Sequence, residues 1–356
     1  MAINKGATEA PSRNIQRSQG LSSDPIDAVI LWVDGDDPEW KARCDKARGG
    51  NVLTKRDDIG GDLRFRQMRE IDWCVAGINK FAPFIRRIYI VTDGQDPHLE
   101  LTVGKWFENP IPVEIVDHKV IFRGYEQYLP TFQCNSLETM IHRIPGLSER
   151  FVYFNDDFVL TNDVKPEDWF IEDGKVVEYG KWMPNFLLDL LHAIKPKKNG
   201  LKTVGFKDIM ENGAKLVGSS KTLLMRHTPH PVLKSLSHRL LAEYPECIDI
   251  NSRDKFRAPC QFNPQVAKHI LAYRDGKLEV RSPKGRTLFL KPFANKPMYL
   301  RNHLKPYIAG KPMPPFMCIN SLAEADPDDR SAFLDFMYGL FELQGNNEKI
   351  ANDERE

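Results

Sequence analysis

Three short acidic loops carry side chains that are suited to binding a metal ion. Asn155-Asp156-Asp157 follows the apolar run Phe151–Phe154, and paired carboxylates at the end of a buried strand suit a hard cation such as Mg²⁺. Two loops of the same character are Asp34-Gly-Asp-Asp-Pro38 and Asp93-Gly-Gln-Asp-Pro97. Adjacent carboxylates repel one another unless a cation or arginines face them. Turns with capping aspartates are the alternative for each loop, but three such loops together favour a metal site.

A histidine pair, His227-Thr-Pro-His230, follows a predicted strand. Zinc ligands on a helix are usually spaced i, i+4 with a third ligand elsewhere, and Thr228-Pro229 would break any helix between these two. A general base that accepts the proton of a hydroxyl nucleophile is the better interpretation, with His227 as the first choice. Capping of a helix N-terminus by a histidine is the alternative.

Arginines near aromatic residues are candidate phosphate ligands, in Arg64-Phe-Arg66 and in Arg253-Asp-Lys-Phe-Arg257. Guanidinium groups bind phosphate in a bidentate manner. For each arginine taken separately, a salt bridge on the protein surface is an equally favoured interpretation. The sequence has no Gly-x-x-x-x-Gly-Lys-Ser/Thr loop, no Gly-x-Gly-x-x-Gly after a strand and no Gly-x-Ser-x-Gly elbow. P-loop chemistry, Rossmann-type dinucleotide binding and α/β-hydrolase chemistry are therefore disfavoured.

Apolar, β-branched runs precede the acidic loops and predict strands at Ile26–Val33, Ile85–Thr92, Phe151–Phe154 and, more weakly, Val113–Val116. Helices are expected between them, over Arg66–Lys80 and Gln133–Arg143. This alternation predicts an α/β fold with a mostly parallel sheet. Ligands bind outside the carboxyl ends of such strands, so the acidic loops should converge there.

The second half of the chain is expected to be less regular. The patterns predict a strand at Lys221–Met225, helices at Pro231–Leu241 and Pro264–Tyr273, a hairpin over Gly276–Leu290, an extended proline-rich segment at 292–315 and a last helix at Asp328–Leu343. Residues 1–23 are expected to form a disordered arm, and residues 346–356 a polar tail.

Composition limits the partners and the compartment. With 50 Lys and Arg against 49 Asp and Glu, the chain lacks the basic excess that is typical of nucleic-acid binding. Two basic runs, Lys195–Lys202 and Arg281–Lys305, are either solvated faces or landing sites for anionic substrate or membrane lipid. Six scattered cysteines without C-x-x-C spacing, and no apolar run long enough to span a bilayer, indicate a cytoplasmic protein whose membrane association would be peripheral.

Four ordered blocks resemble the Stealth family, sugar-phosphate transferases that include bacterial capsule polymerases and the animal lysosomal-enzyme GlcNAc-1-phosphotransferase. They are Ile26–Trp40; a long block from Arg64-Phe65 and Phe81–Gln95 through Asp117-His118, Leu129–Phe132, Glu138 and Ile141–Leu147 to Phe154–Asp157; His227–His230 with Phe256-Arg257; and Met317–Ser321. Two departures stand out: Ala-Pro-Cys-Gln261 after Arg257, and Ser321 after Asn320, both where the family often has an acidic residue.

The resemblance implies a nucleotide-sugar-binding α/β domain of glycosyltransferase type with an added helical catalytic portion. It implies one catalytic unit over 24–345, in which 171–345 completes the active site of 24–170. His227, Arg257 and Asp34 are then catalytic, and Asp156, Asp157 and Asn320 hold Mg²⁺ or Mn²⁺. The matching positions expected to bind substrate are Arg64, Asp93, Gln95, His118, Glu138, His142, Arg143 and His230.

The implied reaction transfers a sugar 1-phosphate from a UDP-sugar to an oligosaccharide or glycolipid acceptor at the inner face of the cell membrane, with release of UMP. Two other functions stay open: a metal-dependent glycosyltransferase that releases UDP, and a non-catalytic sugar-nucleotide-binding protein.

Overall fold

The computed structural model describes residues 24–49, 65–194 and 205–343. The expected arm at 1–23, the tail at 346–356, the basic run at 195–202 and Arg64 therefore lie outside the described residues. The strands are β1 (Ile26–Leu31), β2 (Ile85–Thr92), β3 (Val113–Asp117), β4 (Arg150–Asn155), β5 (Phe158–Leu160), β6 (Phe170–Ile171), β7 (Lys175–Pro184), β8 (Lys221–Met225), β9 (His230–Leu233), β10 (Leu278–Arg281), β11 (Thr287–Leu290) and β12 (Phe316–Ile319).

The helices lie between these strands or after the last of them, singly in some places and in runs of two or three in others. They are α1 (Pro38–Arg48), α2 (Glu70–Phe81), α3 (Val103–Trp106), α4 (His118–Ile121), α5 (Cys134–Met140), α6 (Asn185–Ile194), α7 (Phe206–Leu216), α8 (Lys234–Glu243), α9 (Cys247–Ser252), α10 (Pro264–Arg274), α11 (Tyr299–Ile308) and α12 (Pro327–Phe341). None of the helices within the described ranges is long and apolar enough to cross a membrane.

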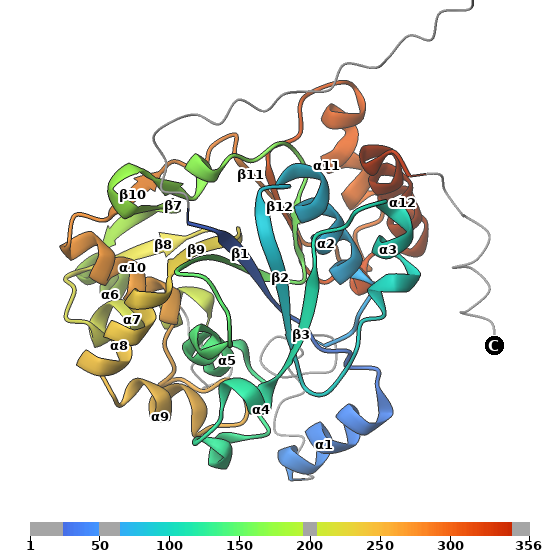
Figure 1. The fold of residues 1–356 in the computed structure, drawn as a ribbon. Helices are drawn as coiled ribbons and strands as arrows, with labels where there is room; N and C mark the ends of the chain where they lie inside the picture. The colour runs from blue at the N-terminus through green and yellow to red at the C-terminus, as the bar shows by residue number, and fades with distance from the viewer. Residues whose placement is uncertain (1–23, 50–64, 195–204, 344–356) are drawn as a thin grey trace, which may run out of the picture.

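A five-stranded sheet in the order β3-β2-β1-β4-β9 forms the centre of the molecule, and only β9 runs antiparallel (Figure 1). Both faces of this sheet are covered. Ala28 and Ile30 of β1 join the apolar cluster that contains α2, whereas Val29 and Leu31 join the cluster that contains α5. This alternation explains why the parallel strands read as continuous apolar runs. The predicted α/β class with a mostly parallel sheet is confirmed.

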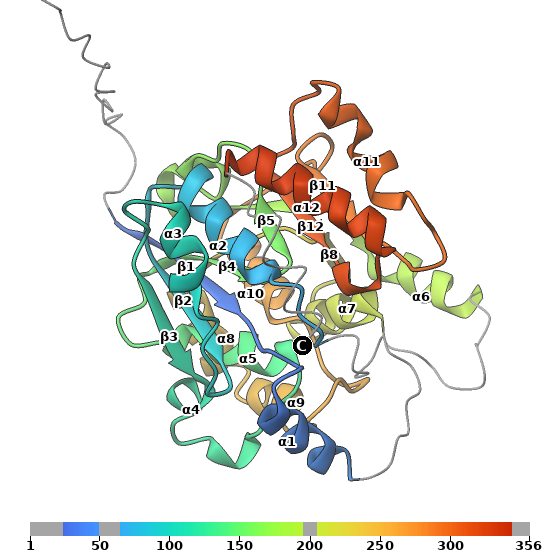
Figure 2. The same ribbon diagram turned by 90° about the vertical axis from the view of Figure 1, so that its right-hand side faces the viewer.

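The added portion is helical only in part, because two smaller sheets belong to it. One has the order β10-β7-β6, and β8 pairs with residues 180–184 at the C-terminal end of β7. The second has the order β11-β12-β5. Side chains of β7, β8, α7 and α10 belong to the same apolar cluster as β1 and α2. In Figure 2, α11 and α12 lie side by side on the opposite side of the molecule from α1.

Three predicted elements of the second half differ from the structure. The helix predicted at Pro231–Leu241 is present as α8 but begins at Lys234, because residues 230–233 form β9, where Pro231 lies opposite Val152 at the sheet edge; a proline is tolerated in an edge strand. The segment 276–290 is no hairpin, because β10 pairs with β7 and β11 pairs with β12, both in parallel. The segment 292–315 is not wholly extended, since Leu300 and Leu304 give α11 an apolar stripe that is buried in the cluster containing α12.

The other predictions differ from the structure only at their ends. Strand β2 has the predicted bounds, β8 likewise, and α10 and α12 lie within a few residues of prediction. Helix α2 begins at Glu70 and not at Arg66, because Arg69 has a left-handed backbone with φ of 61°. Residues 141–143 continue α5 as a tighter 3₁₀ turn before Pro145.

Candidate active site

A cleft of about 560 Å³ opens at the carboxyl edge of the five-stranded sheet. Leu31 and Asn155 reach its wall from the ends of the neighbouring strands β1 and β4. Because β9 runs antiparallel, its first residue, His230, lies at the same edge, opposite Tyr153. Asn320 follows β12, whose end is fixed here because the Ile319 amide donates to the Asp157 carbonyl at 3.0 Å. A larger hollow of about 740 Å³ between α2, α11 and α12 holds none of the residues that the sequence singles out.

Five carboxyl groups line this cleft, those of Glu70, Glu138, Asp156, Asp157 and Glu324. Three of them, Glu70, Asp156 and Asp157, lie close enough to influence one another, and we name them the carboxyl cluster. Asp156 accepts a hydrogen bond from Gln67 Nε2 at 2.7 Å, and Asp157 lies 3.4 Å from Asn320 Nδ2. Glu70, in the first turn of α2, is 5% exposed, and its carboxylate accepts from the Met68 amide at 2.6 Å. Burial, and then the charge of Asp156, raises the pKa of Glu70 to about 8. Burial and the neighbouring Asp157 likewise raise the pKa of Asp156.

This donor set fits a hard divalent cation. Carboxylate and amide oxygens are the ligands that Mg²⁺ and Mn²⁺ prefer, and a cation would offset both the burial and the like-charge repulsion that raise the pKa of Glu70 and Asp156. The structure thus brings together the three residues that the sequence assigned to the metal, Asp156, Asp157 and Asn320.

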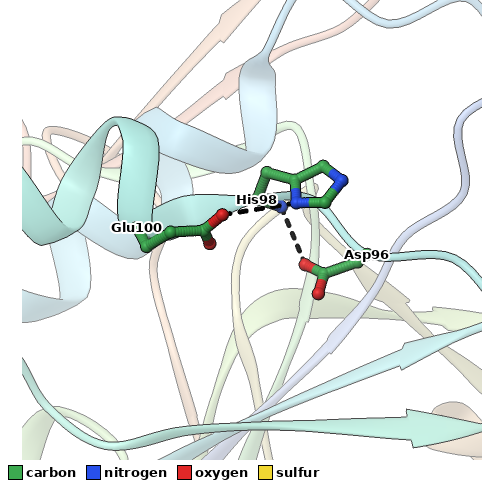
Figure 3. Close-up of side chains that lie close together, drawn as sticks. All are labelled: Asp96, His98 and Glu100. Carbon is green, nitrogen blue, oxygen red and sulfur yellow. Dashed lines mark hydrogen bonds and ion pairs between the residues drawn. The ribbon is translucent and has the colours of Figure 1, made fainter.

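A second acidic group lies outside the cleft. The ligand atoms of Asp96, His98 and Glu100 lie within 4.8 Å of one another on the loop after β2 (Figure 3), and within the described residues no other trio of His, Cys, Asp or Glu does so. All three are exposed. The His98 amide donates to Asp96 at 2.8 Å, and its ring lies 3.3 Å from Glu100, so local turn bonds account for this arrangement.

The acidic loops Asp34–Pro38 and Asp93–Pro97 serve mainly to hold the backbone around them in position. Gln95 clamps Asp34, because its side chain accepts from the Asp34 amide at 3.0 Å and donates to the Asp34 carbonyl at 2.9 Å. Asp37 caps α1 by accepting from the amides of Glu39 and Trp40. Asp93 pairs with Arg43 at 3.0 Å. Asp34, Asp93 and Gln95 lie beside the cleft, and none of them lines it.

His227 and His230 both line the cleft, in different surroundings. The His227 ring stacks between Phe206 and Phe289, with ring centroids 4.7 and 4.9 Å away. Burial, and then the nearby His230, lowers the pKa of His227 to about 4, which keeps the imidazole neutral at pH 7. His230 Nδ1 lies 2.9 Å from Glu178, a fully buried carboxylate of β7. If the ring is neutral and Nδ1 carries the hydrogen, Nε2 is left as a proton acceptor.

Arg257 lines the cleft, and its buried Nε has no hydrogen-bond partner among the residues that the structure describes. Such an atom favours an anionic ligand. Gln261 does not line the cleft and does not take the place of an acidic ligand there; it shapes the loop that carries Arg257, donating to the Phe256 carbonyl and accepting from the Ala258 amide, both at 3.1 Å. Ser321 lines the cleft and donates to Asn320 at 3.1 Å.

The remaining positions divide into two groups. His118 and Glu138 are buried and line the cleft. Burial lowers the pKa of His118 to about 4, and neither of its ring nitrogens has a hydrogen-bond partner within the described ranges. His142 and Arg143 do not line the cleft. His142 packs edge-on against His238, and Arg143 donates to two carbonyls near α4, so both support structure.

Sequence reasoning missed Gln67, Glu70 and Glu178 of this site, whereas Lys291, which lines the cleft, belongs to the basic run Arg281–Lys305 that was predicted to be either a solvated face or a landing site for anionic ligands. Gln67 and Glu70 were assigned to a continuous helix, whose first turn in fact begins at Glu70. Glu178 lies in β7, a strand that the patterns did not reveal. Nothing in its sequence neighbourhood marks it, because its partner is 52 residues away.

Sequence comparison decides the family. The profile "Stealth protein CR1, conserved region 1" matches residues 24–52, and "Stealth protein CR2, conserved region 2" matches residues 64–178. The "Receptor polysaccharide phosphotransferase WefC" of Streptococcus oralis is 32% identical over 286 residues, or 74% of this chain and 82% of the relative. The chain belongs to the Stealth family. It is a transferase of the phosphotransferase type.

Other Stealth relatives match over a similar or longer span. The "Capsular polysaccharide phosphotransferase WcwK" of Streptococcus pneumoniae is 32% identical, covering 74% of this chain and 82% of the relative. The "Exopolysaccharide phosphotransferase CpsY" of Mycobacterium leprae is 28% identical, covering 92% of this chain and 58% of the relative. Among solved structures, the bifunctional glycosyltransferase WbbM matches with a TM-score of 0.44 and 10% identity, over 91% of this chain and 52% of WbbM.

Proposed function

We propose that this Stealth protein transfers a sugar 1-phosphate from a UDP-sugar to a hydroxyl of another sugar, releasing UMP and building a phosphodiester-linked capsule or cell-wall polysaccharide. The observation that carries the proposal is a single cleft in which oxygen ligands, Arg257 and a histidine pair meet. The names of the relatives, which are phosphotransferases of capsular, receptor or exopolysaccharides, support the class of acceptor.

In the proposed step, the acceptor oxygen attacks the phosphorus that bears the donor sugar, and the bond from this phosphorus to the UMP oxygen breaks. UMP leaves with the electron pair, and the hydroxyl proton passes to a cleft histidine. Such transfers depend on in-line positioning and on charge neutralisation more than on covalent catalysis. Arg257 offers paired donors to the phosphoryl oxygens as charge moves toward UMP.

Asp156, Asp157 and Asn320 would hold Mg²⁺ or Mn²⁺, which when bound neutralises the donor diphosphate. Glu70 is added to this set because it faces the same carboxylates. Asp34, clamped by Gln95, is proposed to orient the donor or acceptor from the side of the cleft.

The other positions that the sequence assigned to substrate binding have two kinds of role in the proposal: some contact the substrate, and others support the site. His118 and Glu138 are proposed to touch substrate, since they line the cleft. Arg64 remains a proposed phosphate ligand. Asp93, His142 and Arg143 are proposed to support the loops and helices behind the cleft.

His227 is the proposed general base, because it is neutral at pH 7 and lies in the cleft. His230 is the alternative base, since Glu178 would stabilise the imidazolium that forms when this ring takes a proton. In either case the other histidine of the pair would orient the acceptor.

The proposal extends to the whole chain. Residues 24–170 and 171–345 form one catalytic unit, because Asp156 comes from the first half and His227, Arg257 and Asn320 come from the second. A cytoplasmic location with peripheral contact at the inner membrane face is part of the proposal. It is supported by the absence of disulfides, since all six cysteines are free thiols.

The nucleotide that is released tests the function. The protein is incubated with a panel of UDP-sugars, a sugar acceptor and Mg²⁺, and the nucleotide products are separated by ion-exchange chromatography. UMP released together with a phosphodiester product is the expected result. Release of UDP would instead establish a glycosyltransferase, and donor binding without any release would establish a non-catalytic binding protein.

A further inference from the structure

Helix α6 carries an apolar face that the described part of the chain leaves open. Phe186, Leu190 and Leu191 are 68%, 55% and 51% exposed, and Leu187 is 36% exposed. Their spacing of i, i+1, i+4 and i+5 places these four side chains on one side of the helix. We name them the α6 stripe. An apolar stripe of this kind on a protein surface marks a site of contact with another protein or with a membrane.

The opposite side of α6 attaches the helix to the rest of the molecule. Leu188 is buried, and the Asn185 side chain accepts a hydrogen bond from Thr222 Oγ1 at 2.7 Å. Asp189 pairs with Lys215 at 3.1 Å. Figures 1 and 2 both show α6 at the outer edge of the molecule. The α6 stripe therefore points outward from a helix that is held in place by its other face.

An aromatic pair lies beside the start of α6. The ammonium group of Lys221 lies 4.4 Å from the centre of the Trp182 ring and 4.2 Å from that of Tyr273. Lys221 is paired with Pro184, the residue that precedes α6, and Tyr273 is 43% exposed. Trp, Tyr and Lys side chains combine an apolar body with a polar end, which suits the boundary between a bilayer and water.

The chain that directly follows α6 is basic. The sequence from Lys195 to Lys207 contains five Lys and no Asp or Glu. An exposed apolar helix next to a lysine cluster complements a bilayer with anionic headgroups, because the apolar side chains enter the acyl boundary and the lysines attract the headgroups. A second copy of this chain fits less well, since two such lysine runs would repel one another across a two-fold interface.

Resting on the proposed function, which includes contact with the membrane, we propose that α6 is the membrane-binding element and that its partner is an anionic lipid surface. Thr222, which bonds Asn185 at the start of α6, precedes His227 by five residues, so their Cα atoms lie at most about 18 Å apart. A bilayer bound by α6 would therefore lie close to the proposed base. This arrangement suits an acceptor sugar that is carried on a lipid.

The test measures co-sedimentation of the full chain with two kinds of vesicle, phosphatidylcholine alone and phosphatidylcholine mixed with phosphatidylglycerol. We expect the wild type to prefer the mixed vesicles, and we expect high salt to reduce this binding because salt screens charges at a surface. Phe186→Ser/Leu190→Ser should weaken binding about 100-fold, or about tenfold for each apolar side chain that no longer leaves water.

Leu101→Ser/Ile308→Ser is the matched apolar control. These two side chains are 59% and 67% exposed, as much as those of the α6 stripe, and both lie outside α6. This variant should bind vesicles as the wild type does. If it loses binding and Phe186→Ser/Leu190→Ser keeps it, the membrane contact lies elsewhere and the proposal is wrong.

The contribution of charge is tested with a triple variant in the run that follows α6, Lys195→Gln/Lys197→Gln/Lys198→Gln. It should weaken binding to the mixed vesicles about 100-fold, since each lysine near an anionic surface contributes about fivefold. The matched control changes three exposed lysines of the other basic run, Lys284→Gln/Lys296→Gln/Lys305→Gln, and should leave binding unchanged.

UMP release with a water-soluble sugar acceptor should be the same in all these variants, because none of the changed residues lines the cleft. Failure of the wild type to bind mixed vesicles, or binding that survives Phe186→Ser/Leu190→Ser, would overturn the proposal while UMP release still upheld the proposed function. Light scattering separates the remaining occupant. If the wild type is a dimer that Phe186→Ser/Leu190→Ser dissociates, the α6 stripe joins two copies of the chain and the proposal is wrong.

Discussion

At the scale of single residues, the surroundings of a side chain decide its chemical role. Asp37 and Asp156 both belong to acidic loops that follow strands of one sheet. Asp37 caps a helix, and the bonds to the Trp40 amide lower the pKa of its carboxyl. Asp156 is buried beside another carboxylate, and burial, followed by the charge of Asp157, raises its pKa. Only the second environment leaves a carboxylate in need of a cation.

The base assignment is a prediction at this scale. His227→Ala should lower turnover by roughly 10²–10⁴, the usual contribution of a positioned acid–base group. Donor affinity, measured by calorimetry with a UDP-sugar, should change little because the carboxyl cluster and Arg257 remain. Since the pKa of His227 is about 4, the wild-type rate should fall only when acid protonates this ring near pH 4, and should be flat with respect to this group at neutral pH.

Two variants make that result decisive. His98→Ala removes an exposed histidine outside the cleft and should leave the rate intact. If His227→Ala abolishes donor binding together with turnover, His227 is a binding residue. If His230→Ala alone produces the loss in turnover, the Glu178-bound histidine is the base.

At the scale of elements, close approach between backbones fixes how helices pack on the sheets. Helix α2 supplies Glu70 to the cleft and packs against β5, which directly follows Asp157. Gly77 permits this contact, because a Cβ there would stand 2.8 Å from the Leu160 carbonyl oxygen. The position of α2 relative to the carboxyl cluster therefore depends on one small residue.

Gly77→Ala should consequently lower the free energy of unfolding by about 1–3 kcal/mol, although alanine favours helices intrinsically. Gly339→Ala, in α12, is the matched control: a Cβ there meets nothing within 4 Å, so the variant should be stabilised by about 0.4–1 kcal/mol. Urea unfolding midpoints, at unchanged slope, measure both. Equal stabilisation by the two substitutions would show that α2 does not approach β5 this closely.

At the scale of the whole molecule, the cleft is assembled from separate sheets. Asp156 follows a strand of the five-stranded sheet, and Asn320 follows a strand of the sheet β11-β12-β5. Glu70 comes from the helix between them. A cation shared by these residues would tie distant parts of the chain together, so its binding free energy would add to the stability of the whole fold.

Thermal unfolding should therefore depend on cation and pH together. Because the pKa of Glu70 is raised from 4.5 to about 8, the folded state keeps a proton that the unfolded state releases, and stability without metal should fall as pH rises from 4.5 to 8. Mg²⁺ or Mn²⁺ competes with that proton, so it should raise the melting temperature more at pH 8 than at pH 6. Glu70→Gln should remove the share of this pH dependence that comes from Glu70 and leave the share of Asp156, whose pKa is also raised, to about 7.

The exposed trio on the loop after β2 provides the control. Asp96→Asn should leave the cation-induced rise in melting temperature intact, because this trio lies outside the cleft. A rise that is lost in Asp96→Asn and kept in Asp157→Asn would place the ion on the surface and refute the assignment to the carboxyl cluster.

The sequence alone determined the first half of the fold. Runs such as Ile85–Thr92 are apolar because both faces of the sheet are covered, and this pattern is local. It also determined the family, because the ordered blocks from Ile26–Trp40 to Met317–Ser321 can be recognised without knowledge of any contact. It predicted that Asp157 and Asn320 act together, and they lie 3.4 Å apart.

Only the tertiary structure decided which polar residues face the cleft and which support it. Gln95 and Asp93 belong to the same kind of loop as Asp156, yet Gln95 bonds the backbone of Asp34 and Asp93 pairs with Arg43. The sequence did not reveal this, because a loop sequence does not specify the direction of its side chains. Pro231 looked like a helix start, and the strand it forms depends on pairing with Val152, 79 positions earlier in the chain. Glu178 and His230 meet across 52 residues, and Glu70 owes its raised pKa to burial beside Asp156. Such non-local contacts leave no periodic mark in a sequence, because periodicity records only which face of an element is buried.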